Sequence, residues 1–215
     1  GESGTAPDYA KIAKAVKWLE ESAAQENPFA DYAIGRLYRE GTLVAEDMEK
    51  AVFHLKRAAD AGNSYAQYQL GKIYLEEDTK NIPAAIQYLT LAAKQKNEFA
   101  AYRLGKIYLA GEELPKNTEL ALHYLKMAAD TGNQYAQYTL GKVYLIGKDV
   151  QQDKELAYDY FLKSAEQGNI YAAYFLEHWN DMPHPDLLLM ATRLMRHLEH
   201  IMGENVFGRK SGGSR

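Results

Sequence analysis

The chain has 215 residues, of which 47% are hydrophobic and 25% charged, and its formal net charge is −4. These proportions are typical of a globular domain and unlike those of a disordered chain. The sequence has no cysteine, which excludes disulfides, thiol catalysis and cysteine-based metal sites. Its apolar runs are too short for a membrane-spanning helix.

The N-terminus begins with Gly1 instead of Met and continues with small and polar residues. We interpret residues 1–7 as a trimmed or flexible segment outside the fold. We expect a cytoplasmic location. The periplasm and secretion stay open, because a trimmed chain would have lost any signal peptide.

A repeat of about 36 residues runs along the chain. Asparagines recur at spacings of 36, 34, 36 and 36 residues, at Asn27, Asn63, Asn97, Asn133 and Asn169. Glycines keep the matching steps of 36, 34 and 36 residues, at Gly35, Gly71, Gly105 and Gly141. Repetition at this period is typical of stacked helical units. We expect five units, at about residues 8–46, 47–80, 81–116, 117–152 and 153–180.

Each unit is predicted to be a pair of helices. In the second unit an apolar stripe of helical spacing comprises Ala66, Leu70, Ile73 and Tyr74. The other helix of that unit carries Ala51, Leu55, Ala58 and Ala59. Small residues at these positions let helix axes approach closely.

Capping residues mark the helix boundaries. Each repeated asparagine is a natural N-cap, and Asn27 is followed by Pro28, which is favoured in a first helical turn. The other helix of each unit is predicted to begin after Asp47, Asn81, Asn117 and Asp153. Glycines are expected to end helices in the left-handed conformation at Gly62, Gly132 and Gly168.

The last unit departs from the pattern. Glu177 replaces the packing glycine, and Trp179 takes the position of Ile73. Beyond it an apolar stripe comprises Leu187, Met190, Ala191, Leu194, Leu198 and Ile201. We predict a linker and a capping helix over residues 181–203, followed by a flexible tail over residues 204–215.

The repeat resembles the Sel-one-like repeat, a relative of the tetratricopeptide repeat. The resemblance covers about residues 8–180 and rests on Ala136, Leu140, Gly141, Tyr144, Gly147, Val150, Asp153, Ala157, Tyr160, Ser164, Ala165 and Gly168. It implies an all-α fold, a right-handed α-solenoid of about five helix pairs with the C-terminal capping helix. It also implies an adaptor or scaffold and no particular reaction.

A weaker resemblance concerns the end of the chain. The stretch YAAYFLEHWND…PDLLLMATRLMRHLEHIM looks like the C-terminal region of some bacterial mobilisation relaxases. That resemblance implies an accessory domain that assists a DNA-processing complex. The nicking chemistry of such enzymes would reside elsewhere, because this chain shows no cluster of metal-binding histidines on a strand-rich segment.

Candidate binding residues lie on the helix after each repeated asparagine. Two aromatic residues and a cation follow one another at i, i+3 and i+7, as in Tyr65, Tyr68 and Lys72. The equivalent sets are Phe29, Tyr32 and Arg36; Phe99, Tyr102 and Lys106; Tyr135, Tyr138 and Lys142; and Tyr171, Tyr174 and His178. In tetratricopeptide-like stacks the corresponding face lines a concave groove. Tyrosine supplies contact area, and a cation selects carboxylates.

These observations predict a non-enzymatic adaptor that binds an extended, acidic peptide of a protein partner in its groove. The first alternative is the accessory domain of a relaxase, which alone would bring a nucleic acid as partner. The second is an architectural spacer, in which the tyrosines only pack and the cations form a solvated face. We expect no catalytic residue, cofactor, metal site or membrane contact, and the oligomeric state stays open.

Overall fold

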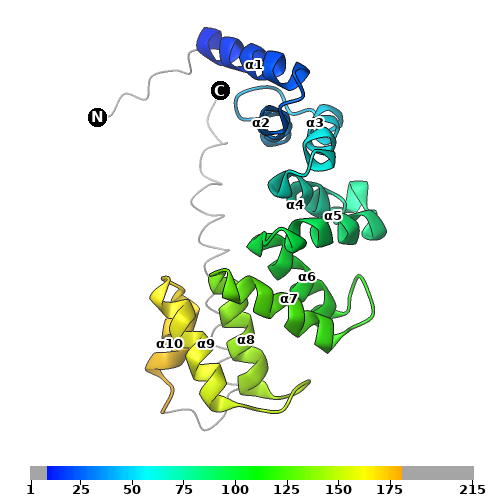
Figure 1. Ribbon diagram of the computed structural model, residues 1–215. Coiled ribbons are helices and arrows are strands. Elements are labelled where there is room, and N and C mark those ends of the chain that lie inside the picture. Colours follow the sequence, from blue (N-terminus) through cyan, green and yellow to red (C-terminus); the bar gives the residue numbers. More distant parts are fainter. Residues whose placement is uncertain (1–8, 181–215) are drawn as a thin grey trace, which may run out of the picture. The chain divides into compact units, whose positions relative to one another are not determined.

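The computed structural model describes residues 9–180, and the predicted capping helix and both terminal segments lie outside them (Figure 1). The chain divides after Gly132 into two compact units, each larger than a single repeat. From here on, the first unit is the part up to Gly132 and the second unit is the part that follows it. In the first unit the helices are α1 (Tyr9–Ala24), α2 (Pro28–Glu40), α3 (Met48–Asp60), α4 (Ser64–Ile73), α5 (Ile82–Lys94), α6 (Glu98–Ala110) and α7 (Thr118–Asp130). A short 3-10 turn, η1 (Glu77–Thr79), precedes α5. In the second unit the helices are α8 (Gln134–Ile146), α9 (Lys154–Glu166) and α10 (Ile170–Glu177). The described residues form no β-strand, so the predicted all-α helical repeat is confirmed.

Helices pack on their neighbours in sequence. Within the first unit each helix contacts the one before and the one after it, and α4 also contacts α6. Within the second unit α9 packs on both α8 and α10. The predicted core face of the second repeat is buried, since Ala66, Leu70 and Ile73 have no exposed surface.

The predicted caps are present. The side chain of Asn63 accepts hydrogen bonds of 3.0 Å from the backbone N–H groups of Tyr65 and Ala66. The side chain of Asp47 accepts one of 3.0 Å from the backbone N–H of Lys50. Gly62 has a φ of +90°, which favours glycine, but Lys96 holds the equivalent position with a φ of +61°.

The packing glycines lie where two helices approach most closely. A Cβ atom on Gly71 would lie 2.5 Å from Cγ of Leu89, and one on Gly105 would lie 2.6 Å from Cγ of Leu125. Carbon atoms pack at about 3.5–4.0 Å. A side chain larger than hydrogen would therefore separate α4 from α5 and α6 from α7.

Stacked rings join the helices of a pair. The ring centroids are 6.0 Å apart in the pairs Tyr74–Tyr88, Tyr108–Tyr124 and Tyr144–Tyr160. In the first pair of this kind a histidine replaces the second tyrosine, and His54 stacks on Tyr38 at 6.3 Å. The same inter-helix contact thus recurs in both units.

Candidate interaction surface

An aromatic row crosses α2, α4 and α6 of the first unit. We use this name for the six rings of Phe29, Tyr32, Tyr65, Tyr68, Phe99 and Tyr102. The ring of Tyr32 lies 6.2 Å from that of Tyr65, and the ring of Tyr68 lies 5.8 Å from that of Phe99. The second aromatic residue of α2 therefore contacts the first of α4, and the second of α4 contacts the first of α6.

The row offers both exposed and half-buried rings. Phe29, Tyr65 and Phe99 are 74%, 55% and 43% exposed, whereas Tyr32, Tyr68 and Tyr102 are half-buried. Two pockets separate the exposed rings: one of about 320 Å³ touches Phe29 and Tyr65, and one of about 200 Å³ touches Tyr65 and Phe99. Amphipathic rings beside small hollows are typical of surfaces that bind proteins.

Predicted cations lie over these rings. The guanidinium of Arg36 is 6.0 Å from the ring centroid of Tyr32, and the ammonium of Lys72 is 5.6 Å from that of Tyr68. Arg36 also donates a 2.9 Å hydrogen bond from Nε to Glu40. That bond raises the pKa of Arg36, although the side chain stays exposed. The charge of Arg36 is thus already satisfied.

Lys72 has a different electrostatic environment. Burial lowers the pKa of its ammonium group, and the charges of Arg39 and Arg103 lower it further, against the opposing effect of Glu76. Among the described residues, no carboxylate lies within 4.0 Å of Lys72 or of Arg103. Two cations without a close counterion are therefore held near the half-buried ring of Tyr68.

Arg39 and Arg103 were not predicted from the sequence. We use the name cationic cluster for Arg39, Lys72 and Arg103, because the charges of the two arginines both act on Lys72 and on Tyr68. A guanidinium nitrogen of Arg39 lies 2.5 Å from a carboxylate oxygen of Glu76, and another donates to the Gln69 side chain at 2.6 Å. The two arginines occupy positions that differ between repeats. Their only sequence signal is a second cation three residues from Arg36 or Lys106.

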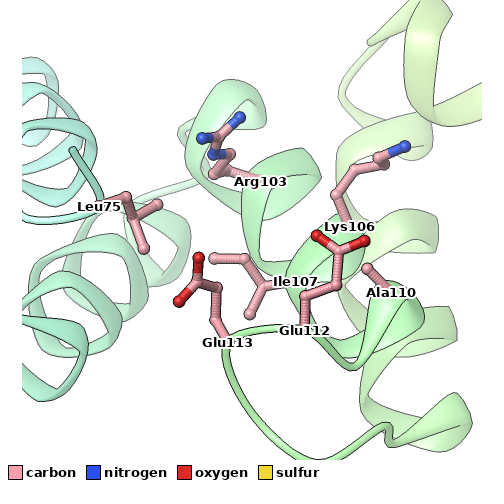
Figure 2. Close-up of a pocket in the computed structure, with 7 residues that line it drawn as sticks. All are labelled: Leu75, Arg103, Lys106, Ile107, Ala110, Glu112 and Glu113. Atoms are coloured by element: carbon pink, nitrogen blue, oxygen red, sulfur yellow. The ribbon is translucent and has the colours of Figure 1, made fainter. Parts of the chain in front are cut away.

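A pocket of about 190 Å³ adjoins the cluster (Figure 2). Its apolar lining comes from Leu75, just after α4, and from Ile107 and Ala110 of α6. Four charged residues also line it: Arg103, Lys106, Glu112 and Glu113. Lys106 is exposed, and it is the predicted site residue that lines this pocket.

The second unit has an equivalent ring contact, between Tyr138 and Tyr171, but there the ring of Tyr138 is buried. Tyr138 lies 6.1 Å from Tyr171, and the ammonium of Lys142 is 4.7 Å from the centre of the Tyr138 ring. Tyr138 is only 4% exposed, because Phe161 and Phe175 cover it. It therefore contributes packing instead of an accessible binding face.

The remaining predicted residues of the second unit are divided in their exposure. Tyr135 is 52% exposed, and Tyr171 and Tyr174 are half-buried. The ring of Tyr174 lies 4.2 Å from that of His178. Of the predicted rings in the described part of this unit, Tyr135 is accessible, and Tyr171 and Tyr174 are accessible in part.

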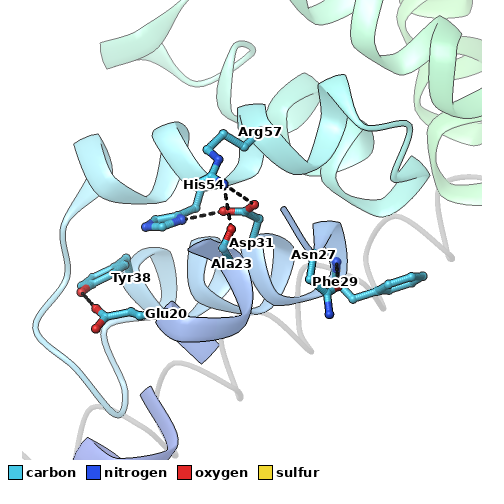
Figure 3. A network of polar contacts seen from close by, with 8 residues as sticks. All are labelled: Glu20, Ala23, Asn27, Phe29, Asp31, Tyr38, His54 and Arg57. Carbon is cyan, nitrogen blue, oxygen red and sulfur yellow. Dashed lines mark hydrogen bonds and ion pairs between the residues drawn. The ribbon is translucent and has the colours of Figure 1, made fainter. Parts of the chain in front are cut away.

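A buried polar network in the first unit is structural (Figure 3). Asp31, which is 2% exposed, lies 2.8 Å from Nδ1 of His54 and 3.5 Å from a guanidinium nitrogen of Arg57. Arg57 also donates a 2.8 Å hydrogen bond to the backbone oxygen of Ala23. A buried carboxylate needs such partners. The network joins α1, α2 and α3.

Two further properties concern the described residues alone. Between residues 9 and 180, no three His, Asp or Glu side chains are grouped so that they could hold a metal ion. No helix in the same range is long and apolar enough to cross a membrane.

Comparison with protein families gives five consecutive matches. The model of the Sel1 repeat, which is the Sel-one-like repeat of the sequence analysis, matches residues 1–27, 28–63, 64–97, 99–133 and 134–169. Among curated proteins, no sequence matches the chain significantly.

Several solved structures are similar to this chain. A Sel1 repeat protein from Oxalobacter formigenes is 29% identical, with a TM-score of 0.69 over 75% of this chain and 66% of its own. A protective antigen of uropathogenic Escherichia coli with an SLR fold is 26% identical, with a TM-score of 0.70 over 73% of this chain and 34% of its own. The immunity protein PA5088 of Pseudomonas aeruginosa is 25% identical, with a TM-score of 0.54 over 88% of this chain and 69% of its own. The chain thus spans less than two thirds of the first two relatives.

Proposed function

Because the chain belongs to the Sel1 repeat family, whose members are commonly non-enzymatic scaffolds for protein interactions, we propose that its first unit binds an extended, acidic segment of a partner protein. The segment lies along the aromatic row and places carboxylates at the cationic cluster. The chain catalyses no reaction on it.

The observation that carries this proposal is the pair of cations without a close counterion. Lys72 and Arg103 have no carboxylate within ion-pair distance among the described residues, in a protein whose net charge is −4. Like charges near one another repel, and the partial burial of Lys72 adds to this cost, whereas Arg103 is exposed. A carboxylate between Lys72 and Arg103 would relieve that repulsion and form hydrogen bonds worth about 1.5–3 kcal/mol each.

The aromatic row supports an extended shape for the segment. Exposed rings follow one another on three successive helices of the same kind, with a pocket between each two. Rigid aromatic rings give a large contact area at a low entropy cost. A segment that crosses α2, α4 and α6 would reach several of them.

The proposal is tested with a display library of random twelve-residue peptides, selected on the unmodified protein. We expect the enriched peptides to be acidic and their affinity to fall as salt is raised. The Lys72→Glu variant should bind the enriched peptides at least tenfold more weakly than the unmodified protein does. Lys56→Glu is the matched control, because Lys56 is an exposed lysine of α3, and it should change the affinity little once equal helix content is confirmed.

Other outcomes separate the alternatives. Enrichment of basic peptides, or an equal effect of the two substitutions, would contradict the proposal. A single-stranded oligonucleotide that binds tightly and competes with the peptides would favour the DNA-related alternative. If no peptide is enriched in the selection, the result would favour the alternative that the chain is an architectural spacer. The relaxase hypothesis itself stays a prediction, because most of the segment on which it rests lies beyond residue 180.

A further inference from the structure

We infer that the pocket in Figure 2 holds one apolar side chain of the bound segment, next to an acidic residue that sits between Lys72 and Arg103. The inference rests on the proposed function and adds to it a residue pattern that the partner must carry. That pattern is an acidic residue, then a large apolar residue, then a residue that is not acidic.

The lining of the pocket fits an apolar side chain. Leu75 and Ala110 present carbon atoms to it, and Ile107, which is 7% exposed, lies between them in the view of Figure 2. The volume of about 190 Å³ is several times the space of one water molecule. Moving a leucine-sized side chain from water into such a place is favourable, because its apolar surface is removed from water.

Arg103 connects this pocket to the cationic cluster. It lines the pocket, and its charge also acts on Lys72 and on the hydroxyl of Tyr68. The equivalent positions in the other repeats are Ala33, Gln69, Thr139 and Phe175. Among these positions only residue 103 is an arginine, which lines the pocket and also acts on Tyr68 and Lys72. Specificity in repeat folds resides in such variable positions.

The charges around the pocket have opposite signs. Arg103 and Lys106 come from α6, and Glu112 and Glu113 come from the segment that follows it. Glu113 is paired with Lys80 at 3.3 Å. Among the described residues, Glu112 has no cation within 4.0 Å. An acidic residue is thus favoured toward Arg103, and Glu112 disfavours a second acidic residue on the other side.

Three synthetic peptides with one fluorescent label and identical flanking Gly and Ser residues test the inference. Their central residues are Glu-Leu-Lys, Glu-Ala-Lys and Glu-Leu-Glu, and affinities are measured by fluorescence polarisation. We expect the first peptide to bind about tenfold tighter than the second, because alanine leaves the pocket empty. We expect the third peptide to bind at least threefold more weakly than the first, because Glu112 repels its second glutamate.

Variants then locate the effect. Ala110→Trp fills the pocket from an exposed position and should abolish the difference between leucine and alanine. Ile146→Trp, at the equivalent exposed position of α8, should preserve it. Glu112→Lys should reverse the preference, so that Glu-Leu-Glu binds more tightly than Glu-Leu-Lys.

The outcomes distinguish the two proposals. Three peptides of equal affinity that all weaken in Lys72→Glu would overturn the inference and leave the proposed function in place. A leucine preference that survives Ala110→Trp would also overturn it. If none of the three peptides binds, the inference is wrong, and the library selection decides separately whether acidic segments bind at all.

Discussion

Replacing Gly71 by alanine tests the packing argument most directly. The new Cβ atom would lie 2.5 Å from Cγ and 2.7 Å from Cδ2 of Leu89, about 1 Å inside a normal carbon contact. Leu89 has no exposed surface, so it has little room to rotate away. Overpacking of this kind costs about 1–3 kcal/mol. Alanine regains about 1 kcal/mol of helix propensity over glycine, which leaves an expected net loss of about 0–2 kcal/mol.

A double-mutant cycle isolates the clash from other effects. Leu89→Ala alone should cost about 2–5 kcal/mol, because it leaves a cavity in the core. In the double variant the methyl group of residue 71 enters that cavity. We therefore expect the combined loss to be smaller than the sum of the single losses by about 1–3 kcal/mol.

The assay is urea unfolding followed by far-UV circular dichroism. Midpoints are compared at constant slope, because a repeat protein can depart from two-state unfolding. Additivity within about 0.5 kcal/mol would refute the reasoning, since it would mean that the two side chains do not meet. A stabilised Gly71→Ala variant would refute it as well.

Three further substitutions have expected effects on stability. Lys96→Gly should raise the urea midpoint, by about 0.5–1 kcal/mol in free energy, because it relieves a left-handed φ of +61°; a lower midpoint would contradict this. Asp31→Ala should lower stability by about 1–3 kcal/mol, because it leaves Arg57 without its buried carboxylate; an unchanged midpoint would show that the network is dispensable. The backbone N–H of Lys50 lowers the pKa of Asp47 below its ordinary value. Its carboxylate therefore stabilises the fold above the unfolded-state pKa, and the contribution is lost as pH falls through the lower folded-state pKa. In denaturation measured against pH, Asp47→Ala should be less stable than the unmodified protein at neutral pH, and the two should converge in acid.

Much of the fold could be predicted because it depends on local rules that recur every repeat. The caps at Asn63 and Asp47 follow from side-chain chemistry at helix ends. The close approach at Gly71 follows from the steric size of one residue type. Because these signals recur at equivalent positions of the repeats, several repeats support the prediction of each helix boundary.

Exposure at the candidate surface could not be predicted from the repeat pattern. Tyr68 and Tyr138 hold the same repeat position, yet the first is half-buried and the second is 4% exposed. The difference arises where Phe161 replaces the leucine of other repeats and Phe175 takes the position of Arg103. Both rings then cover Tyr138.

The cationic cluster escaped the sequence analysis for a related reason. Arg39 and Arg103 are 64 positions apart and occupy different places in their repeats. No periodicity connects them with Lys72. Their charges come together because Tyr32 of α2 contacts Tyr65 of α4, and α4 contacts α6.

Packing between neighbouring helices also determines how the protein folds and unfolds. Because almost every inter-helix contact within a unit joins elements next to each other in sequence, little loop-closure entropy opposes folding, and fast folding is expected. The same arrangement lets a helix pair open without melting the whole unit. Amide hydrogen exchange in the first unit should therefore be slowest in α4 and α5 and faster in α1, which lies at the end of the described part of that unit. A ligand that spans α2, α4 and α6 would suppress these local openings and slow exchange well beyond the residues it touches.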